Sequence, residues 1–193
     1  MQTITKTALF SNKKTGFNIL LFVLLYVILL QGFYLYVGIT SPGGRLYSSF
    51  LDKYADFPEW LTILIAKTSV LLLKLAGYTV YQKNPANIIM DGGGGVNIAW
   101  GCLGVGAMSL WIGFIAAHRA AAGYKLKWML AGIILICIVN ILRVITIVIS
   151  LHNHWRYPMR FDAHTSFNIL TYAVIVAFMY IFIRNYKAQS YKQ

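Results

Sequence analysis

Residues 128–151 read WMLAGIILICIVNILRVITIVISL, an apolar run whose only charged side chain is that of Arg143. A bilayer core is about 30 Å thick, and a helix needs about 20 mostly apolar residues to cross it. The run therefore predicts a spanning helix over residues 128–150. An intramembrane arginine costs about 2.5–3.5 kcal/mol on insertion scales and usually marks a functional site. The alternative for Arg143 is an arginine that snorkels from the helix end to the outer interface.

Three further apolar runs predict spanning helices over residues 17–37, 102–117 and 166–183. The first run follows Lys13 and Lys14, as in a signal peptide, but it is longer than an h-region of 7–15 residues. We therefore expect it to be retained in the membrane. The run over residues 102–117 is rich in glycine and close to the shortest length that spans a bilayer.

Residues 59–77 form a fifth apolar segment of different character, because it carries Lys67 and Lys74. These two lysines are seven residues apart and therefore share one face of a helix. We expect an amphipathic helix that lies in the outer interface with its lysines reaching toward water. A fifth crossing, or a segment that dips in and returns, is the alternative.

The charged residues predict the orientation of these helices. The formal net charge is +12, but the basic residues flank apolar runs and form no stripe, which argues against a nucleic-acid-binding protein. Cytoplasmic segments of membrane proteins are rich in lysine and arginine. The tail over residues 1–16, the loop near 118–127 and the tail over 184–193 each carry three basic residues, whereas residues 38–59 carry a net charge of −1. Both termini are therefore expected inside, with an even number of crossings.

Residues 78–101 contain two β-prone stretches around a turn at Asp91 and the glycines 92–95. This pattern favours an outer β-hairpin. The glycine run lacks the Lys-Ser/Thr pair of a phosphate-binding loop. The expected fold is a single all-α polytopic membrane domain. It has four spanning helices, an outer interfacial amphipathic helix and a small extracytoplasmic β-hairpin.

Three residues of the kinds used in acyl transfer are predicted to lie at one depth near the outer face. Helix rise from the cytoplasmic boundaries places Cys102 and Arg143 about 24 Å, and His164 about 30 Å, into their helices. A thiolate can attack a peptide carbonyl, and an imidazole can carry its proton. Arginine stays protonated, so Arg143 is expected to stabilise the thiolate and the oxyanion.

Two neighbouring residues are expected to support this site. Asn140 lies one turn before Arg143 and could bond the guanidinium or a nearby backbone group. Gly104, beside Cys102, would let a substrate backbone approach closely. Cys137 is expected to be a small buried hydrophobe, and His118 to be solvated in a basic cytoplasmic loop. No cofactor and no metal are expected. The weaker alternative is a metal site built from His152, His154, Asp162 and His164.

The chain resembles the exosortase/archaeosortase family, as a small, short-form member. The resemblance rests on Cys102-Leu-Gly104 opening a helix, Asn140-Ile-Leu-Arg143 late in the next helix and His164 just before the last, and it covers roughly residues 59–184. It departs from longer members in having four or five spans rather than about eight, and in the leucine that follows Cys102.

The resemblance implies a membrane cysteine protease or transpeptidase in the cytoplasmic membrane, with its active site on the extracytoplasmic side. Its substrates would be exported proteins that end in a short motif, a hydrophobic helix and a basic tail. Cleavage would form an acyl-enzyme on Cys102, resolved by water or an amine. Two rival hypotheses are a non-enzymatic membrane scaffold or assembly factor, in which Arg143 only clamps helices together, and a metal-dependent membrane hydrolase.

Overall fold

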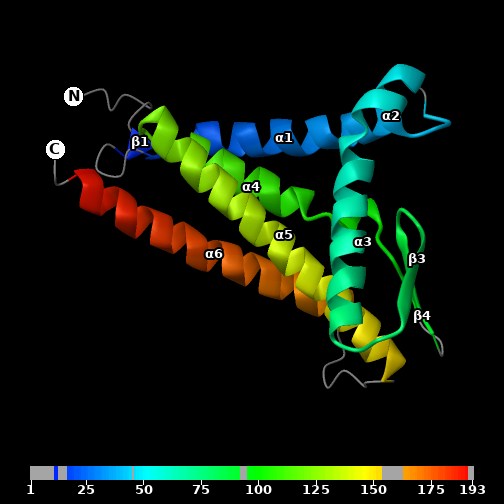
Figure 1. Cartoon of the computed structure of the whole chain (residues 1–193). Coiled ribbons are helices and arrows are strands. Elements are labelled where there is room, and N and C mark those ends of the chain that lie inside the picture. Colours follow the sequence, from blue (N-terminus) through cyan, green and yellow to red (C-terminus); the bar gives the residue numbers. More distant parts are fainter. Residues whose placement is uncertain (1–10, 13–16, 45, 92–94, 154–162, 191–193) are drawn as a thin grey trace, which may run out of the picture. The chain divides into compact units, whose positions relative to one another are not determined.

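The computed structural model describes residues 11–12, 17–44, 46–91, 95–153 and 163–190, and the side chains within 17–44, 46–91, 95–153 and 165–186. Long helices dominate these residues (Figure 1). The helices are α1 (Ile19–Thr40), α2 (Ser49–Ala55), α3 (Phe57–Leu75), α4 (Val105–Ala116), α5 (Ala122–His152) and α6 (Ala163–Ser190), with a 3-10 helix, η2, over Trp100–Cys102. The strands are β1 (Ser11–Asn12), β2 (Phe17–Asn18), β3 (Val80–Asn84), β4 (Asn87–Met90) and β5 (Gly95–Asn97).

Three of the described helices are long and apolar enough to cross a membrane. They are Ile19–Thr40, Ala122–His152 and Thr165–Tyr186. Helices α5 and α6 extend beyond the predicted spans of 128–150 and 166–183, because hydropathy marks the apolar part of a helix and not its ends. The predicted tail over 184–193 is accordingly helical as far as Ser190.

The predicted spanning helix over residues 102–117 is shorter than expected. Helix α4 begins at Val105 and ends at Ala116. Its 12 residues rise about 18 Å, well short of the hydrocarbon thickness. Cys102 belongs to η2 instead, so counting helix rise from His118 to Cys102 was wrong.

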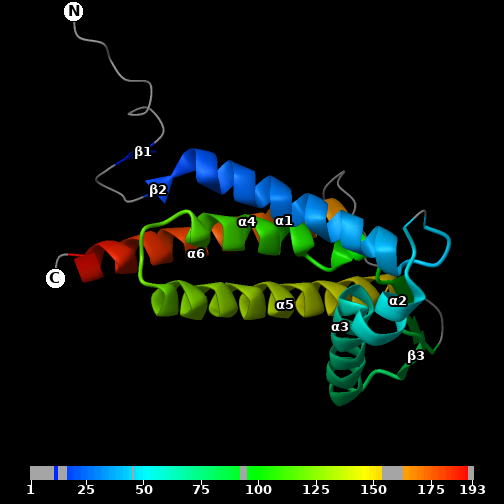
Figure 2. The ribbon, with the colours of Figure 1, turned by 90° about the horizontal axis from the view of Figure 1, so that it is seen from above.

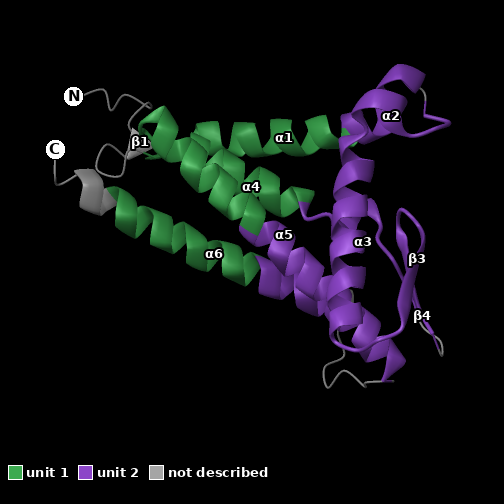
Figure 3. Cartoon of the chain, viewed as in Figure 1, with its two compact units in different colours: residues 1–34, 105–134, 172–193 green, residues 35–104, 135–171 purple. Residues whose placement is uncertain are grey.

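The chain divides into two compact units, and the residues of α1, α5 and α6 are shared between them (Figure 3). Unit 1 contains residues 1–34, 105–134 and 172–193. A short ladder between β1 and β2 immediately precedes α1 in this unit (Figure 2).

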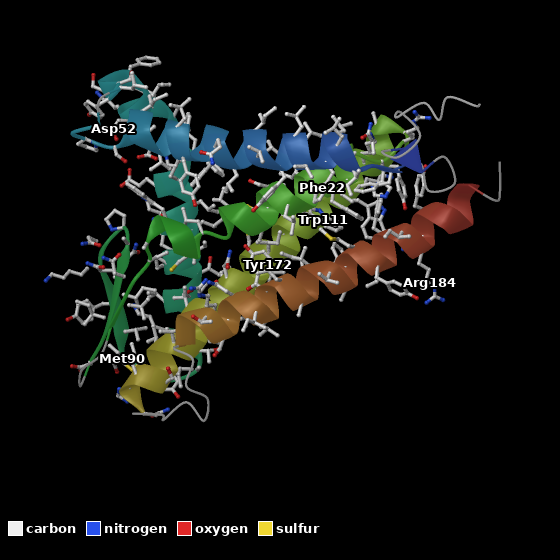
Figure 4. The ribbon with its side chains drawn as sticks, turned by 180° about the vertical axis from the view of Figure 1, so that it is seen from behind. Phe22, Asp52, Met90, Trp111, Tyr172 and Arg184 are labelled. Carbon is white, nitrogen blue, oxygen red and sulfur yellow. The ribbon has the colours of Figure 1, made fainter. Side chains whose placement is uncertain are left out.

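Trp111 of α4 forms the centre of the packing in unit 1, and Figure 4 labels it with Phe22 of α1 and Tyr172 of α6. It is 1% exposed, and its ring stacks on that of Phe178 with centroids 4.9 Å apart. Its Nε1 donates a hydrogen bond to the carbonyl oxygen of Trp128 at 3.0 Å. A Cβ at Gly132 would lie 1.9 Å from that Nε1, so only glycine lets the indole pack against α5.

His118 of unit 1 is buried, contrary to the expectation of a solvated loop residue. It is 4% exposed and lies among the rings of Phe17, Phe114, Phe182 and Tyr186. Its Nδ1 is 2.8 Å from the carbonyl oxygen of Phe114. A hydrogen bond to a helix-end carbonyl satisfies the imidazole away from water, which sequence position alone did not indicate.

Unit 2 contains residues 35–104 and 135–171, including the amphipathic helix α3. Asp56 caps α3 by accepting a hydrogen bond from the backbone N–H of Glu59, and Pro58 occupies its first turn. One face of the helix is buried, through Leu61, Ile65, Ala66, Ser69 and Leu73. The opposite face exposes Trp60, Leu64, Lys67, Leu71, Lys74 and Leu75.

The segment after α3 forms a three-stranded antiparallel sheet in the order β3-β4-β5, rather than the two strands expected from the sequence. The register pairs Tyr81 with Ile89 and Ile88 with Val96. The extra turn lies at Pro85 and Ala86, where the side chain of Asn84 accepts hydrogen bonds from the N–H groups of Ala86 and Asn87. An Asn-Pro pair is a turn signal. Helix α2 was also not predicted.

Candidate active site

Cys102 lies at the end of η2, in unit 2, and not in a spanning helix. The 3-10 turn is closed by hydrogen bonds from the N–H of Cys102 to the carbonyl oxygen of Ala99 (2.7 Å) and from Leu103 to Trp100 (3.1 Å). Leu103 is fully buried, whereas Cys102 is partly exposed. The buried leucine anchors the turn and leaves the thiol-bearing residue accessible.

Gly104 interrupts the helical conformation between this turn and α4. It has φ +74°, in the left-handed region where a side chain is strained. A Cβ at this position would also lie 2.2 Å from Nδ2 of Asn140. The requirement for glycine is thus explained by the approach of Asn140, whereas its expected role in substrate approach stays a prediction.

Asn140 joins α5 to the segment that carries Cys102. Its Nδ2 donates a hydrogen bond to the carbonyl oxygen of Leu103 at 3.0 Å, and the side chain is 1% exposed. Of the two roles open to it from the sequence, it therefore bonds a backbone group. This bond fixes the backbone next to Cys102 against α5.

Arg143 is buried in unit 2, with an exposed fraction of 2%. Helix α5 continues for nine residues beyond Arg143, about 14 Å. Arg143 therefore does not lie at a helix end, as the snorkelling alternative requires. Its Nη1 donates a hydrogen bond to Oδ1 of Asn168 at 3.1 Å. Its Nε and Nη2 are buried and have no hydrogen-bond partner among the residues described.

Position 164 lies near the start of α6, which begins at Ala163. The side chain of His164 lies outside the described part of the structure. Its position is four residues before Asn168, and positions four apart share one face of a helix. Arg143 thus contacts the α6 residue one turn from the predicted acid/base.

Two hydrogen bonds place α5 against the segments that carry two of the predicted residues, the turn of Cys102 and the first part of α6. Asn140 bonds the residue after Cys102, Arg143 lies one turn further along α5, and Asn168 joins that arginine to α6. Sequence reasoning missed Asn168. An amide in an apolar helix, one turn after His164, is the same signal that identified Asn140.

The described residues contain no group of three or more His, Cys, Asp or Glu side chains arranged to hold an ion, but only His152 of the predicted metal alternative has a described side chain, so that alternative stays a prediction. His154 and Asp162 lie outside the described residues. His152 ends α5, and its ring is 6.1 Å from that of Tyr78.

Apolar helices of spanning length define a helical membrane protein, and its candidate site includes a buried arginine on α5 and a cysteine-bearing turn that Asn140 joins to the same helix. Residues 17–181 match the model of the transmembrane exosortases. The chain therefore belongs to the transmembrane exosortase family, a family of membrane-embedded protein-sorting enzymes that act on exported proteins. It is a multi-pass membrane protein. No curated protein matches it, and no solved structure does.

Proposed function

We propose that this protein is a cysteine protease or transpeptidase that cleaves C-terminal sorting signals of exported proteins. Cys102 is the nucleophile, His164 the general acid and base, and Arg143 the group that stabilises the thiolate and the oxyanion. Asn140 and Asn168 position them. The substrate would end in a short motif, a hydrophobic helix and a basic tail, and the helix would pack along the spanning helices.

The observation that carries this proposal is the state of Arg143. Its guanidinium is buried, one nitrogen is held by Asn168, and Nε and Nη2 have no partner among the described residues. Leaving buried donors unpaired is costly, and such groups in native structures call for an explanation. Two adjacent N–H donors of a guanidinium suit an oxyanion that exists only during the reaction.

The proposed reaction needs no cofactor. Sγ of the Cys102 thiolate attacks the scissile carbonyl carbon, and the C–N bond breaks after the tetrahedral intermediate forms. His164 gives a proton to the departing amine of the tail, which leaves a thioester on Cys102. Water or an amine then attacks the thioester carbonyl, its proton passes to His164, and the thiolate is released.

We further propose the topology in which this site faces the extracytoplasmic side of the cytoplasmic membrane. Helices α1, α5 and α6 cross the bilayer, and the short apolar helix α4 with the segment before it makes the fourth crossing. Both basic tails are then cytoplasmic, as lysine-rich and arginine-rich segments prefer. Helix α3 lies in the outer interface, which is supported by the leucines, tryptophan and lysines on its exposed face.

The test uses a tailed exported protein from the same genome, expressed in cells with either of two cysteine variants. We expect Cys102→Ala to leave the tail attached, as read by intact mass. Cys137→Ala is the matched control, since Cys137 is the other cysteine of the chain and has no role in the proposed reaction, and it should process the substrate normally. Normal tail removal by Cys102→Ala would refute the proposal.

The scaffold hypothesis makes the opposite prediction. It expects Cys102→Ser to keep full function and Arg143→Ala only to lower the amount of folded protein. Thiol alkylation applied from the outer side separates the two, because only the enzyme loses activity when Cys102 is blocked.

A further inference from the structure

The short helix α2 and the start of α3 present aromatic side chains that the protein leaves exposed. Phe50 is 68% and Tyr54 58% exposed, and their ring centroids are 5.1 Å apart. Residues four apart share one face of a helix, so these two rings lie on one face of α2. Phe57 and Trp60, in the first turn of α3, are 47% and 55% exposed. Exposed apolar surface of this kind marks a contact with a partner or a membrane.

The attachment of α2 to the end of α1 indicates what covers this face. The last residues of α1 and all of α2 belong to unit 2 and lie side by side (Figure 1). The N–H of Ser48, the residue before α2, donates a hydrogen bond to the carbonyl oxygen of Ile39 at 2.9 Å. The hydroxyl of Tyr36 donates one to the carbonyl oxygen of Ala55, at the other end of α2. Both ends of α2 are therefore held against the end of α1.

The length of α1 places these contacts at a membrane surface. Its 22 residues rise about 33 Å, close to the thickness of a bilayer core of roughly 30 Å. When α1 crosses the membrane, Tyr36 and Ile39 thus lie near the boundary between hydrocarbon and headgroups. These two residues differ in depth by only about 4.5 Å, whereas α2, with 7 residues, is about 10 Å long. Helix α2 therefore lies near that boundary and runs along the membrane surface more than away from it.

The composition of the exposed face fits the lipid interface. Tyrosine and tryptophan are enriched where hydrocarbon meets headgroups, because each has an apolar ring and a polar group that stays hydrated. Lys53 is exposed on α2, and its Nζ is 5.2 Å from the ring centroid of Tyr54. A lysine beside aromatic rings can extend its ammonium group toward lipid phosphates. The face also follows directly on the exposed apolar surface of α1, where Leu35 is 55% exposed.

We propose that α2 and the first turn of α3 form an aromatic anchor that inserts into the lipid interface at the membrane surface where α1 ends. The anchor consists of Phe50, Tyr54, Phe57 and Trp60. This assignment rests on the proposed crossing of the membrane by α1 and not on the proposed reaction. Because Asp56 alone separates α2 from α3, the anchor also holds the start of α3 at the same depth. The connection between α1 and α3 is thus bound to the membrane rather than solvated.

The test is nitroxide labelling of the full chain in vesicles of phosphatidylethanolamine and phosphatidylglycerol. Cys102→Ala and Cys137→Ala remove the native thiols, and Phe50→Cys or Tyr54→Cys then introduces a single labelling site. Both side chains are exposed, so their replacement leaves the packed core intact. Power-saturation EPR compares the accessibility of each label to O₂, which concentrates in lipid, with its accessibility to a water-soluble nickel chelate. We expect the ratio of the two accessibilities to be several-fold higher at both positions than at a solvated reference position.

Two reference positions calibrate this ratio in the same background. Lys83→Cys is the solvated reference, because Lys83 is an exposed charged residue of strand β3. Ile28→Cys is the reference for hydrocarbon, because Ile28 is 55% exposed near the middle of α1. The ratio for labels at Phe50 and Tyr54 should lie between those of the two references, as the boundary between hydrocarbon and headgroups requires. A high ratio at Ile28 also tests the crossing of α1 separately from the anchor.

Three results would overturn the anchor. A ratio for the α2 labels equal to that at Lys83 would mean that α2 faces water. Labels on α2 that are shielded from both reagents would mean that another protein chain covers this face. A solvated ratio at Ile28 would refute the crossing of α1 and the anchor together. Failure of tail removal to depend on Cys102 would refute the proposed reaction and leave the labelling result standing.

Discussion

Nδ2 of Asn140 donates a hydrogen bond to the carbonyl oxygen of Leu103 at 3.0 Å, and both side chains are buried. This bond joins the middle of a long apolar helix to the residue after Cys102. Arg143 lies on the same helix one turn later. The bond therefore also fixes the position of the Cys102 segment relative to the part of α5 that carries Arg143. Asn140 therefore has a structural role that is independent of the chemistry.

Replacing Asn140 by leucine is expected to destabilise the protein while preserving the volume of the side chain. The carbonyl of Leu103 would be buried without a donor, and interhelical hydrogen bonds in membrane proteins contribute about 0.6–2 kcal/mol. The measurement is the midpoint of unfolding in mixed micelles. Thr146→Val is the control, since the hydroxyl of Thr146 bonds only to Leu142 on its own helix. A midpoint as high as that of Thr146→Val would argue against the bond.

Gly104→Ala is expected to abolish tail removal and to lower stability by at least about 2 kcal/mol, from the strained backbone and the contact with Asn140. Gly101→Ala provides a close control, because a Cβ at position 101 meets no atom within 4 Å. Adding Asn140→Ala should relieve only the loss of stability that comes from the contact with Asn140. The double variant should therefore lose less stability than the two single variants lose together. Activity and unfolding midpoint measured on all four proteins give the coupling.

The sequence indicated the long helices well, because hydropathy over about 20 residues reflects the bilayer itself. Helices α1, α5 and α6 lie where apolar runs predicted them, and the amphipathic face of α3 follows its lysine spacing. Their ends were placed less accurately, since helix continues into polar sequence that hydropathy ignores.

The local geometry around Cys102 was beyond sequence reasoning for a different reason. A glycine at φ +74° interrupts what hydropathy shows as one continuous run, and only the position of Asn140 explains why the interruption lies there. The burial of His118 depends likewise on Phe182 and Tyr186, more than 60 residues away along the chain. Tertiary contacts of this kind leave no periodic signal.

Arg143→Lys is expected to lower kcat for tail removal by about 100-fold, as loss of an oxyanion donor does in other acyl-transfer enzymes. Lysine keeps the positive charge but lacks the planar guanidinium. In the parent protein, one nitrogen of that group bonds Asn168, and two further nitrogens remain available as donors. Arg184→Lys serves as the control, because Arg184 is exposed on α6. Single-turnover rates check the prediction, and an unchanged rate for Arg143→Lys would remove Arg143 from the mechanism.

Asn168 is expected to act as a positioning residue for Arg143. Asn168→Leu removes the acceptor of the Nη1 hydrogen bond, whereas Asn168→Asp retains an oxygen at the same place. We expect the leucine variant to have a lower kcat with an unchanged KM. We expect the aspartate variant to recover most of the parent kcat. A loss of similar size in both variants would assign Asn168 a packing role only.

Stability is expected to depend on pH through His118, which lies between α4 and α5 and outside the candidate spans. Burial among aromatic rings lowers the pKa of His118; the hydrogen bond to Phe114 opposes this shift, and the charge of Lys125 adds to it. The folded protein therefore binds fewer protons than the unfolded chain below the unfolded pKa of about 6.5. The contribution of neutral His118 to the free energy of unfolding is fully present above the unfolded pKa. It is lost as the pH falls from the unfolded pKa toward the lower folded pKa. His118→Phe keeps the aromatic packing and cannot titrate, so the difference in thermal midpoint between parent and variant should grow from pH 7.5 to 5. A difference that stays constant over that range would show that the buried imidazole does not titrate with unfolding.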